Sequence, residues 1–312
     1  MRKEFEQCRW DDQLQAAWEA LLRLAIEEDL GRDGDLTTLS LVPGDAKGRA
    51  GIKARQSGVV AGLAGVAGAL AVIDGTLAWS PEARDGQTVE RGTLAGVVSG
   101  RAQGLFAVER LLLNFLGRLS GIATLTRQYV EAVAGAKARI FDTRKTTPGW
   151  RRLEKYAVRC GGGWNHRGGL FEAVLIKDNH LAWGAAEKAV PPSRGYTPAE
   201  AVSRARQYVA KRAAQVDPST VIIEVEVDTL EQLDHVLPAG PDIVLLDNMT
   251  VEQLREAVAR RDKMGVGVEL EASGGVTLAT VRQIAETGIE RISVGALTHS
   301  ASALDFGLDW MQ

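Results

Sequence analysis

The sequence lacks most of the features that mark secreted, membrane-bound or disulfide-stabilised proteins. Among its 312 residues only two are cysteines, Cys8 and Cys160, too few and too far apart for a disulfide framework or a zinc site. No apolar run reaches the length of a membrane span, and the opening residues MRKEFEQCRWDD contain no apolar signal-peptide core. We therefore expect a protein of the reducing cytoplasm.

A strong charge of one sign is also absent. The formal net charge is −3 and no basic stripe runs along the chain, which argues against a general nucleic-acid surface. With 45% hydrophobic and 25% charged residues, the chain can build one large core or two ordinary ones, and nothing in it indicates disorder.

Positive charge is nevertheless concentrated in one stretch, residues 142–180. Eight lysines and arginines and two histidines lie there against four acidic residues. Such runs usually form the solvated face of a helix, and this can explain Arg151 to Lys155. It does not explain the cations that adjoin strand ends, turns and glycine runs, where anions are commonly bound; these are Arg144, Lys145, His166, Arg167 and Lys177. We expect a pocket for a small, strongly anionic ligand.

The first part of the chain mixes helical and strand-like patterns. Apolar residues recur at helical spacing from Asp12 to Glu28, and this helix should end at Leu30-Gly31. Alternating patterns predict strands at 48–60, 76–79 and 94–98. Helical periods return at 105–118 and 123–133, where we expect the first domain to end.

The remaining residues alternate between short β-rich runs and helical stretches. Such alternation is typical of parallel strands with crossover helices, and six strands suit an incomplete barrel or an open sheet. The runs are 138–141, 173–176, 221–227, 243–246, 266–270 and 291–294, with helices such as 199–213 and 251–261 between them.

Almost every one of these strands ends in a polar or glycine-rich element. The sequences are DTRKT, KDNH, EVEVD, LLDN, EASGG and VGALTH. A single polar strand end can be explained by its exposure to solvent. In a parallel β/α barrel, however, functional groups collect at the carboxyl ends of the strands, so the set predicts one composite site.

Paired carboxylates lie on two of the strands. Glu224 and Glu226 are two residues apart, as are Glu269 and Glu271, so each pair shares one face of its strand. Inside a barrel they need cationic or metal partners, and Lys145 and Lys177 are candidates. Alternatively, Glu224, Glu269 and Glu271 form structural ion pairs that close the barrel.

The other strand ends supply groups for a phosphorylated ligand. Asp247 delivers a carboxylate beside Asn248, which suits a Mg²⁺-associated diphosphate or sugar hydroxyls. Small residues with free backbone N–H groups can approach a phosphate; these are Ser273, Gly274, Gly275 and Gly295. A lone histidine such as His299 is more often structural than catalytic.

Several long motifs together resemble the quinolinate phosphoribosyltransferase family, also named nicotinate-nucleotide pyrophosphorylase. They are ERLLLNFLGRLSGIATLT, DTRKTTPG, EKYAVRCGGGWNHRGGLFEAVLIKDNH, EVEVDTLEQL, LLDNM, EASGGV and ISVGALTHSA, in the same order as in the family. The resemblance extends from about Glu28 to the C-terminus. It implies conversion of quinolinate and phosphoribosyl pyrophosphate, with Mg²⁺, into nicotinate mononucleotide, pyrophosphate and CO₂.

The resemblance also implies a fold and an assembly. The fold is an N-terminal α/β sandwich domain, residues 1–120, followed by an open α/β barrel, residues 121–299, with residues 300–312 packing back on the first domain. The expected assembly is a homodimer in which Arg110 enters the neighbouring subunit's pocket.

Roles for individual residues follow from the same resemblance. Arg144, His166, Arg167 and Lys177 would hold the two quinolinate carboxylates, and Asp178, Asn179 and His180 would support Lys177. The phosphoribosyl donor would be held by Lys145, Glu226, Asp247, Ser273, Gly274, Gly295 and His299. Lys145, Lys177, Glu226 and Asp247 are the expected catalytic residues, and Glu226 and Asp247 the expected Mg²⁺ contacts.

Departures from the family pattern concern substrate fit. Leu111 replaces a small threonine, and Trp150 and Trp164 are bulky residues beside substrate motifs. Two alternatives stay open: a paralogous phosphoribosyltransferase of the type associated with molybdate transport, and a non-catalytic phosphate- or nucleotide-binding barrel.

Overall fold

The computed structural model describes residues 3–183 and 195–311, which divide into two compact units. Unit 1 consists of residues 1–6, 129–144 and 165–295, and unit 2 of residues 7–128, 145–164 and 296–312. The boundary therefore falls between Arg144 and Lys145, in the middle of the basic stretch. No helix in the described part of the chain is both long and apolar enough to cross a membrane.

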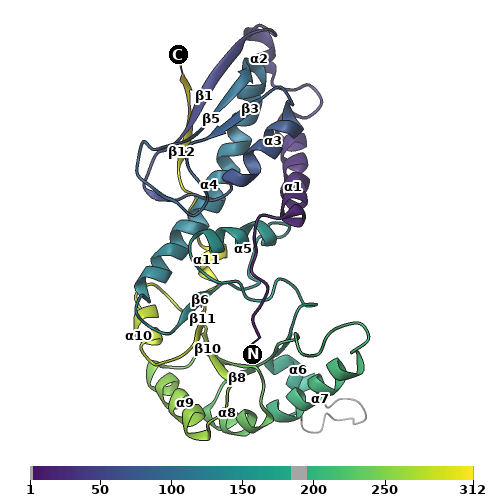
Figure 1. The fold of residues 1–312 in the computed structure, drawn as a ribbon, viewed down its shortest axis with the longest axis vertical. Coiled ribbons are helices and arrows are strands. Elements are labelled where there is room, and N and C mark those ends of the chain that lie inside the picture. Colours follow the sequence, from purple (N-terminus) through teal and green to yellow (C-terminus); the bar gives the residue numbers. More distant parts are fainter. Residues whose placement is uncertain (1–2, 184–194, 312) are drawn as a thin grey trace. The chain divides into compact units, whose positions relative to one another are not determined.

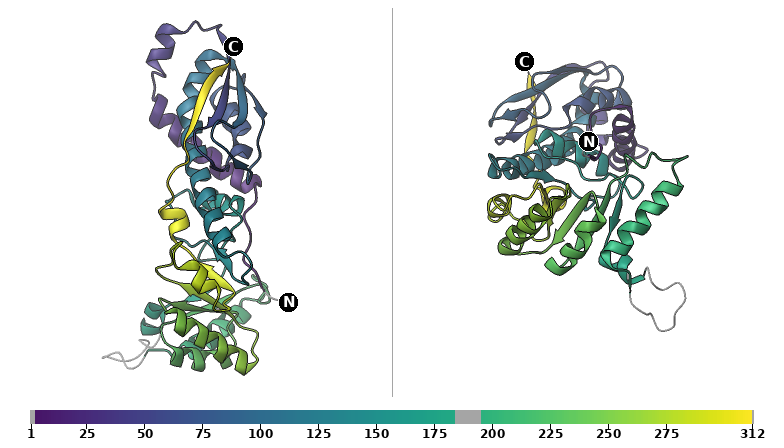
Figure 2. Two further views of the ribbon diagram at one scale, coloured as in Figure 1. Left: turned by 90° about the vertical axis from the view of Figure 1, so that its left-hand side faces the viewer. Right: turned by 60° about the horizontal axis from the view of Figure 1, so that its bottom comes forward.

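Unit 2 is built on a four-stranded antiparallel sheet in the order β12-β1-β5-β3. Its strands are β1 (Lys47–Ala54), β3 (Ala78–Pro81), β5 (Leu94–Arg101) and β12 (Phe306–Met311), and a small second sheet pairs β2 (Gly58–Val59) with β4 (Thr88–Val89). The C-terminal strand β12 pairs antiparallel with β1, so Ala50 lies opposite Trp310. Figure 2 shows this yellow strand beside the blue strands of the sheet.

Helices complete unit 2. They are α1 (Asp12–Leu30), α2 (Leu36–Leu41), η1 (Leu63–Gly65), α3 (Val66–Ile73), α4 (Ala102–Ala132), α5 (Arg151–Cys160) and α11 (Ala296–His299). Helix α1 begins after Asp11, whose carboxylate accepts the N–H of Leu14, and ends at Gly31 as predicted. Its buried side chains, among them Trp18 and Leu22, follow the helical period of the sequence.

Helix α4 corrects the prediction of two helices at 105–118 and 123–133. The structure has one helix of 31 residues, whose last residues already belong to unit 1. Gly121 does not end the helix. A Cβ atom there would lie 2.0 Å from the carbonyl oxygen of Ser302, so the glycine permits close approach of the chain that leads to β12.

Unit 1 contains a six-stranded, fully parallel sheet in the order β6-β11-β10-β9-β8-β7. Its strands are β6 (Arg139–Phe141), β7 (Val174–Ile176), β8 (Ile223–Val227), β9 (Ile243–Asp247), β10 (Glu269–Ser273) and β11 (Arg291–Ser293). This is the predicted open α/β barrel. Strand β10 begins three residues later than the predicted 266–270, after the glycine-containing turn at 265–267, and it therefore carries Ser273 at its end.

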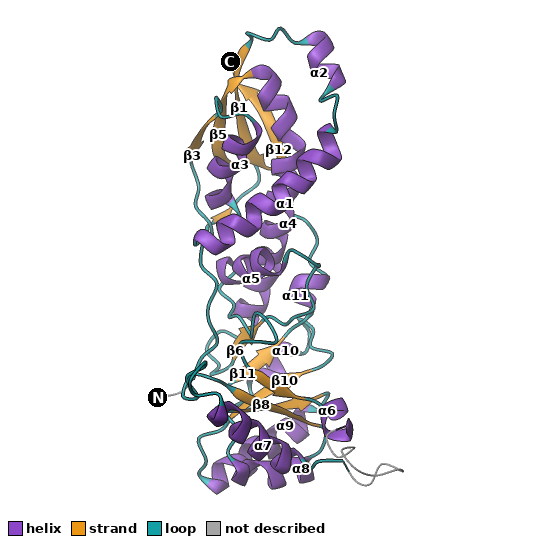
Figure 3. Cartoon of the chain, turned by 90° about the vertical axis from the view of Figure 1, so that its right-hand side faces the viewer, coloured by secondary structure: helices purple, strands orange, loops and turns teal. Residues whose placement is uncertain are grey.

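Crossover helices connect the strands, and Figure 3 shows α7 (Pro198–Lys211), α8 (Leu230–Val236) and α9 (Val251–Met264) below the labelled strands β8 and β10. The other helices of this unit are α6 (Asp178–Trp183), η2 (Leu237–Ala239) and α10 (Val281–Ala285). Thr197 and Thr250 form capping boxes with Glu200 and Gln253, so α7 and α9 begin at defined residues directly beyond the loops. The strand ends are thereby held by rigid elements.

Candidate active site

The carboxyl ends of adjacent strands bring the predicted donor-binding residues together in unit 1. Asp247 ends β9 and is paired in register with Ser273, which ends β10. Glu226, on neighbouring β8, forms an ion pair with Lys177, which follows β7 directly. We call these groups, Lys177, Glu226, Asp247 and Ser273, the strand-end layer.

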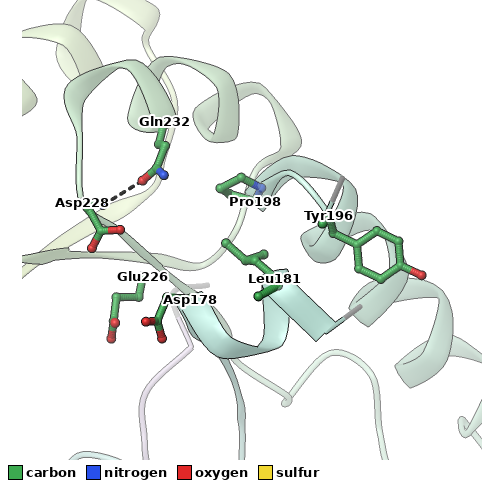
Figure 4. Close-up of a pocket in the computed structure, with 9 residues that line it drawn as sticks. Asp178, Leu181, Tyr196, Pro198, Glu226, Asp228 and Gln232 are labelled. Atoms are coloured by element: carbon green, nitrogen blue, oxygen red, sulfur yellow. Dashed lines mark hydrogen bonds between the residues drawn. The ribbon is translucent and has the colours of Figure 1, made fainter. Parts of the chain in front are cut away.

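In the strand-end layer the carboxylates of Glu226 and Asp247 lie near a single cation, Lys177. Burial and the neighbouring carboxylates of Asp247 and Asp178 raise the pKa of Glu226, and Lys177 only partly offsets this effect. Glu226 and Asp178 also line a pocket of about 300 Å³ with Asp228 and Gln232. In Figure 4 the carboxylates of Glu226 and Asp178 lie next to each other at one side of this pocket. Clustered carboxylate oxygens of this kind are the ligands that Mg²⁺ prefers.

The loops after β9 and β10 are locked together. The N–H of Asn248 donates to the carbonyl oxygen of Ser273 at 2.9 Å, and its side-chain amide donates to Asp247 at 2.7 Å. Asn248 has a positive φ of 53°. Gly274 has a φ of +92°, and a Cβ atom there would lie 2.1 Å from Asn248 Oδ1. Only glycine fits this position, which orients the Asp247 carboxylate.

The predicted acceptor-binding cations are organised by Asp142, which follows β6. Its buried carboxylate accepts the N–H of His166 at 2.8 Å and the side-chain amide of Asn165 at 2.6 Å. These bonds fix the segment that carries Arg167. Because Asp142 is itself fixed at a strand end, Arg167 cannot move away from that end without breaking buried hydrogen bonds.

The positive charges of Arg167 and Arg144 lie close together. Arg167 is buried, and Nη1 donates to the carbonyl oxygen of Ala173 at 3.1 Å, but Nε has no hydrogen-bond partner in the described part of the chain. Burial and the nearby positive charge of Arg144 lower the pKa of Arg167. Two guanidinium groups held near each other, one of them buried, favour binding of an anion between or beside them.

The imidazole of His166 is engaged within the protein. Its Nδ1 accepts the N–H of Arg167 at 2.8 Å, which assigns the proton to Nε2. Nε2 lies 3.0 Å from Glu224 and 3.5 Å from Glu271. Burial lowers the pKa of His166 and the two carboxylates raise it by more, but protonation of Nδ1 would break its hydrogen bond with the Arg167 N–H, so we take the ring as neutral. This arrangement favours support of Arg167 rather than direct contact with a ligand.

Beneath the strand-end layer lies a second ionic layer, His166, Glu224, Glu269, Glu271 and Arg291, which we call the buried layer. Arg291 Nε donates to Glu271 at 2.9 Å and Nη1 to Glu269 at 3.2 Å. Glu224, Glu271 and Arg291 are fully buried. The sequence suggested either lysine partners or structural ion pairs for the strand carboxylates. Glu224, Glu269 and Glu271 form ion pairs within the barrel, whereas Glu226 pairs with Lys177.

His166, Glu224 and Glu271 could in principle hold a metal ion, since one ligand atom of each lies within 4.8 Å of the others. The guanidinium of Arg291 already contacts Glu271 and lies near Glu224, and a further cation would be repelled by it. Arg291 and His166 lower the pKa of Glu224 in spite of its burial, while burial and Glu224 raise the pKa of Glu271. We therefore interpret the buried layer as a structural ion-pair network centred on Arg291.

The other predicted residues lie elsewhere along these elements. The backbone N–H of Lys177 donates to Nδ1 of His180 at 2.9 Å. Asp178 and Asn179 are exposed and begin helix α6. Gly295 ends unit 1 directly before α11.

Lys145, His299 and Arg110 belong to unit 2, and all three are exposed. The carbonyl oxygen of Lys145 accepts a hydrogen bond from Thr298 Oγ1 at 2.7 Å, which ties the Lys145 loop to the helix of His299. Arg110 lies on α4 next to Leu111, which is buried. Trp150 stacks on Phe115 and Trp164 lies against Arg159, so both indole rings have partners within unit 2.

A buried ion pair supports the same region of unit 2. Glu154 on α5 is fully buried, accepts from Arg118 at 2.7 Å, and accepts the N–H of Thr147 at 3.1 Å. Lys155 is buried as well. The residues from Arg151 to Lys155 are therefore not simply the solvated helix face that the charge run suggested.

Several residues that organise the site have no functional motif in the sequence. Asp142 is one of the four acidic residues in the basic stretch, and its position directly after a predicted strand is a usable signal. Arg291 and the early residues Glu4 and Phe5 carried no motif. Their contacts join segments far apart in the sequence, so local patterns could not reveal them.

Comparisons with known proteins identify the family of the chain. Residues 35–120 match the family described as quinolinate phosphoribosyl transferase, N-terminal domain, and residues 122–309 match its C-terminal domain. The chain belongs to the quinolinate phosphoribosyltransferase family. The two matched regions cover most of the sequence and divide it at α4.

Relatives and solved structures support the family over nearly the whole chain. A nicotinate-nucleotide pyrophosphorylase (carboxylating) of Mycobacterium leprae is 41% identical over 92% of this chain and 95% of its own length. A probable enzyme of the same name from Bacillus subtilis is 38% identical over 90% of this chain and 89% of its own. The solved structure of the nicotinate-nucleotide pyrophosphorylase from Francisella tularensis has a TM-score of 0.85, with 33% identity over 99% of this chain and 100% of that one.

Proposed function

We propose that this protein transfers the phosphoribosyl group of phosphoribosyl pyrophosphate to quinolinate, with decarboxylation, to form nicotinate mononucleotide, pyrophosphate and CO₂. One observation supports it above all. Buried and strand-end cations, Arg144, Arg167 and Lys177, lie in the same unit as the strand-end carboxylates Glu226 and Asp247. A doubly charged aromatic acid needs the first set, and a ribose with a metal-bound diphosphate needs the second.

Quinolinate, the phosphoribosyl acceptor, is bound through its negative charges. Arg144, Arg167 and Lys177 bind the two carboxylates of quinolinate. The buried Arg167 orients the ring because its backbone is fixed by Asp142 through His166 and its planar guanidinium donates to the carbonyl oxygen of Ala173. His166 supports Arg167 from behind. A substrate with fewer carboxylates would leave part of this positive charge uncompensated, which supports quinolinate over the acceptor of a paralogous phosphoribosyltransferase.

The donor is held by the strand-end layer and by backbone groups. Glu226 and Asp247 bind ribose hydroxyls or Mg²⁺, and the loop of Ser273 and Gly274 approaches phosphate through N–H groups. The carboxylate donor set fits Mg²⁺, which when bound would neutralise the diphosphate charge. Lys145, Gly295 and His299 complete the donor contacts in this proposal.

The reaction follows from these positions. The quinolinate nitrogen attacks the anomeric carbon of ribose as the bond to the pyrophosphate oxygen breaks, and the oxygen retains the electron pair. Glu226 or Asp247 stabilises positive charge that develops on the ribose. The ring nitrogen is then positively charged, so the ring accepts the electrons left when the 2-carboxylate departs as CO₂, and a proton replaces the carboxylate at that carbon.

We also propose a homodimer in which Arg110 of one protomer contributes to the acceptor pocket of its partner. Its exposed position on α4 is compatible with this role. The test mixes an Arg110→Ala variant with an Arg144→Ala variant. Because each mixed dimer would retain one intact pocket, partial recovery of activity is expected, and no recovery would argue against shared pockets.

The function itself is tested with purified protein, Mg²⁺, phosphoribosyl pyrophosphate and quinolinate labelled in its 2-carboxylate. Release of labelled CO₂ with equimolar nicotinate mononucleotide is expected. Nicotinate in place of quinolinate should be a poor substrate because it lacks the second carboxylate. Binding of the donor without any turnover would instead indicate a non-catalytic barrel.

A further inference from the structure

Residues Lys3–Glu6, which we call the N-terminal segment, are separated by more than a hundred residues from everything else in unit 1 but belong to it. Figure 1 labels β6, β8 and β11, three of the strands at whose beginnings this segment makes contacts. Lys3 Nζ donates to the carbonyl oxygen of Val221 at 2.7 Å and lies 3.1 Å from Asp242, so the segment is anchored where β8 and β9 begin.

The same segment reaches the starts of the other strands. The N–H of Glu6 donates to Glu172 at 3.0 Å, just before β7. Glu4 lies 2.9 Å from Arg139 at the start of β6 and 3.7 Å from Arg291 at the start of β11. Four residues thus contact the amino ends of β6, β7, β8, β9 and β11, opposite the ends that carry the candidate active site.

Phe5 is the member of the segment that enters the interior. It is 3% exposed and clusters with Ala173, Ile222 and Ile243. Its ring stacks on the imidazole of His166, with centroids 4.4 Å apart and an interplanar angle of 28°. The guanidinium of Arg291 lies 5.1 Å from the centre of the same ring.

We propose that Phe5 is a positioning residue for quinolinate binding, an inference that rests on the proposed function. The ring of Phe5 holds one face of the His166 imidazole while Glu224 and Glu271 hold Nε2. A fixed imidazole presents Nδ1 to the Arg167 N–H, and Arg167 is the buried acceptor-binding cation. The path therefore runs from Phe5 through His166 to Arg167 by direct contacts.

The inference predicts an effect on the acceptor alone. Loss of the stacked ring should loosen His166 and Arg167 but leave the donor groups Glu226, Asp247 and Ser273 in place, because none of them contacts the N-terminal segment in any interaction that we observe. Phe5→Leu keeps an apolar side chain and removes the flat ring. Phe5→Tyr keeps the ring, so it should restore near-normal behaviour.

The experiment measures steady-state kinetics of the full-length protein with each substrate varied in turn. For Phe5→Leu we expect KM for quinolinate to rise about three- to tenfold, the factor that corresponds to a typical aromatic contact, with KM for phosphoribosyl pyrophosphate unchanged. The matched control is Phe306→Leu, because Phe306 is also buried, at 6% exposure, but lies in β12 of unit 2. This control should lower stability but leave both KM values unchanged.

A second measurement does not depend on turnover. The chain has four histidines, so nitrogen-15 imidazole spectra can resolve His166. We expect the His166 signals to shift or broaden in Phe5→Leu and to stay near wild type in Phe5→Tyr and Phe306→Leu. Unchanged His166 signals in Phe5→Leu, or equal changes in both KM values, would overturn the positioning role. Absence of wild-type turnover would overturn the proposed function instead, and the spectra would still decide the role of Phe5.

Discussion

Glu224 and Glu226 lie two residues apart on the same face of β8, yet their environments differ completely. Glu224 is fully buried against His166, and His166 and Arg291 lower its pKa in spite of burial. Glu226 is partly open to a pocket, pairs with Lys177, and has a raised pKa. Two residues along one strand therefore separate a carboxylate that forms buried ion pairs in the barrel from one that lines a pocket. Position along the strand, rather than residue type, assigns the role.

The largest expected effect comes from Glu226, the less buried member of the pair. Glu226→Gln removes the negative charge that would stabilise the developing charge on ribose, and we expect kcat to fall about 100- to 1,000-fold. The midpoint of thermal unfolding should change little, since the pair with Lys177 is partly solvated. Steady-state kinetics and calorimetry on the same preparation measure both quantities. A variant with wild-type kcat would remove Glu226 from the reaction.

The buried member should show the opposite pattern. Glu224→Ala removes one of the three carboxylates that surround His166 and Arg291 inside the barrel, and the free energy of unfolding should fall by about 3 to 5 kcal/mol. Urea denaturation measures this loss. If Glu224→Ala were as stable as wild type while its kcat collapsed, the division between the two layers would be wrong.

A smaller effect should appear in the pH dependence of stability. Burial and Glu224 raise the pKa of Glu271, so the folded protein binds this proton more tightly than the unfolded chain does. The stabilisation that Glu271 provides is fully present below the ordinary pKa of glutamate. It is lost as the pH rises through the raised pKa of Glu271.

Glu271→Gln cannot lose that proton, so its free energy of unfolding relative to wild type should increase with pH across this window and then level off. Denaturation series at several pH values measure the difference. A relative stability that stays constant with pH would contradict the raised pKa of Glu271.

The smallest expected effect is a shift of a pH profile. Asp178 helps to raise the pKa of Glu226, so Asp178→Asn should lower it. Because the proposed donor site needs ionised Glu226, the acid limb of kcat/KM for phosphoribosyl pyrophosphate should move to lower pH. The control is Asp228→Asn, a change in the same pocket at a residue that is not among the main causes of the Glu226 shift. Equal shifts in both variants would show that general charge, not Asp178, sets the limb.

Much of unit 1 could be predicted because strand ends carry local signals. The runs DIVLLDN and EASGG place Asp247 and Ser273 at the carboxyl ends of β9 and β10, as the structure has them. The parallel order of the strands then brings these residues to one edge, which requires no knowledge of distant contacts.

The rest depended on contacts that no local pattern encodes. The predicted interval between helices at 105–118 and 123–133 contains Gly121, which in the structure lies inside one helix and permits close packing against Ser302. His166 read as a ligand-binding residue because it lies among cations, yet its ring nitrogens face Glu224, Glu271 and the Arg167 N–H. Phe5 had no signal at all, since its partner is more than 150 residues away in the sequence.

The most direct test of the account is a crystal structure with quinolinate bound. We predict that its two carboxylates lie within hydrogen-bonding distance of Arg144, Arg167 and Lys177, while the imidazole of His166 keeps its place between Phe5 and the buried glutamates. A structure in which these cations point to solvent, or in which His166 leaves the buried layer to contact quinolinate itself, would contradict it.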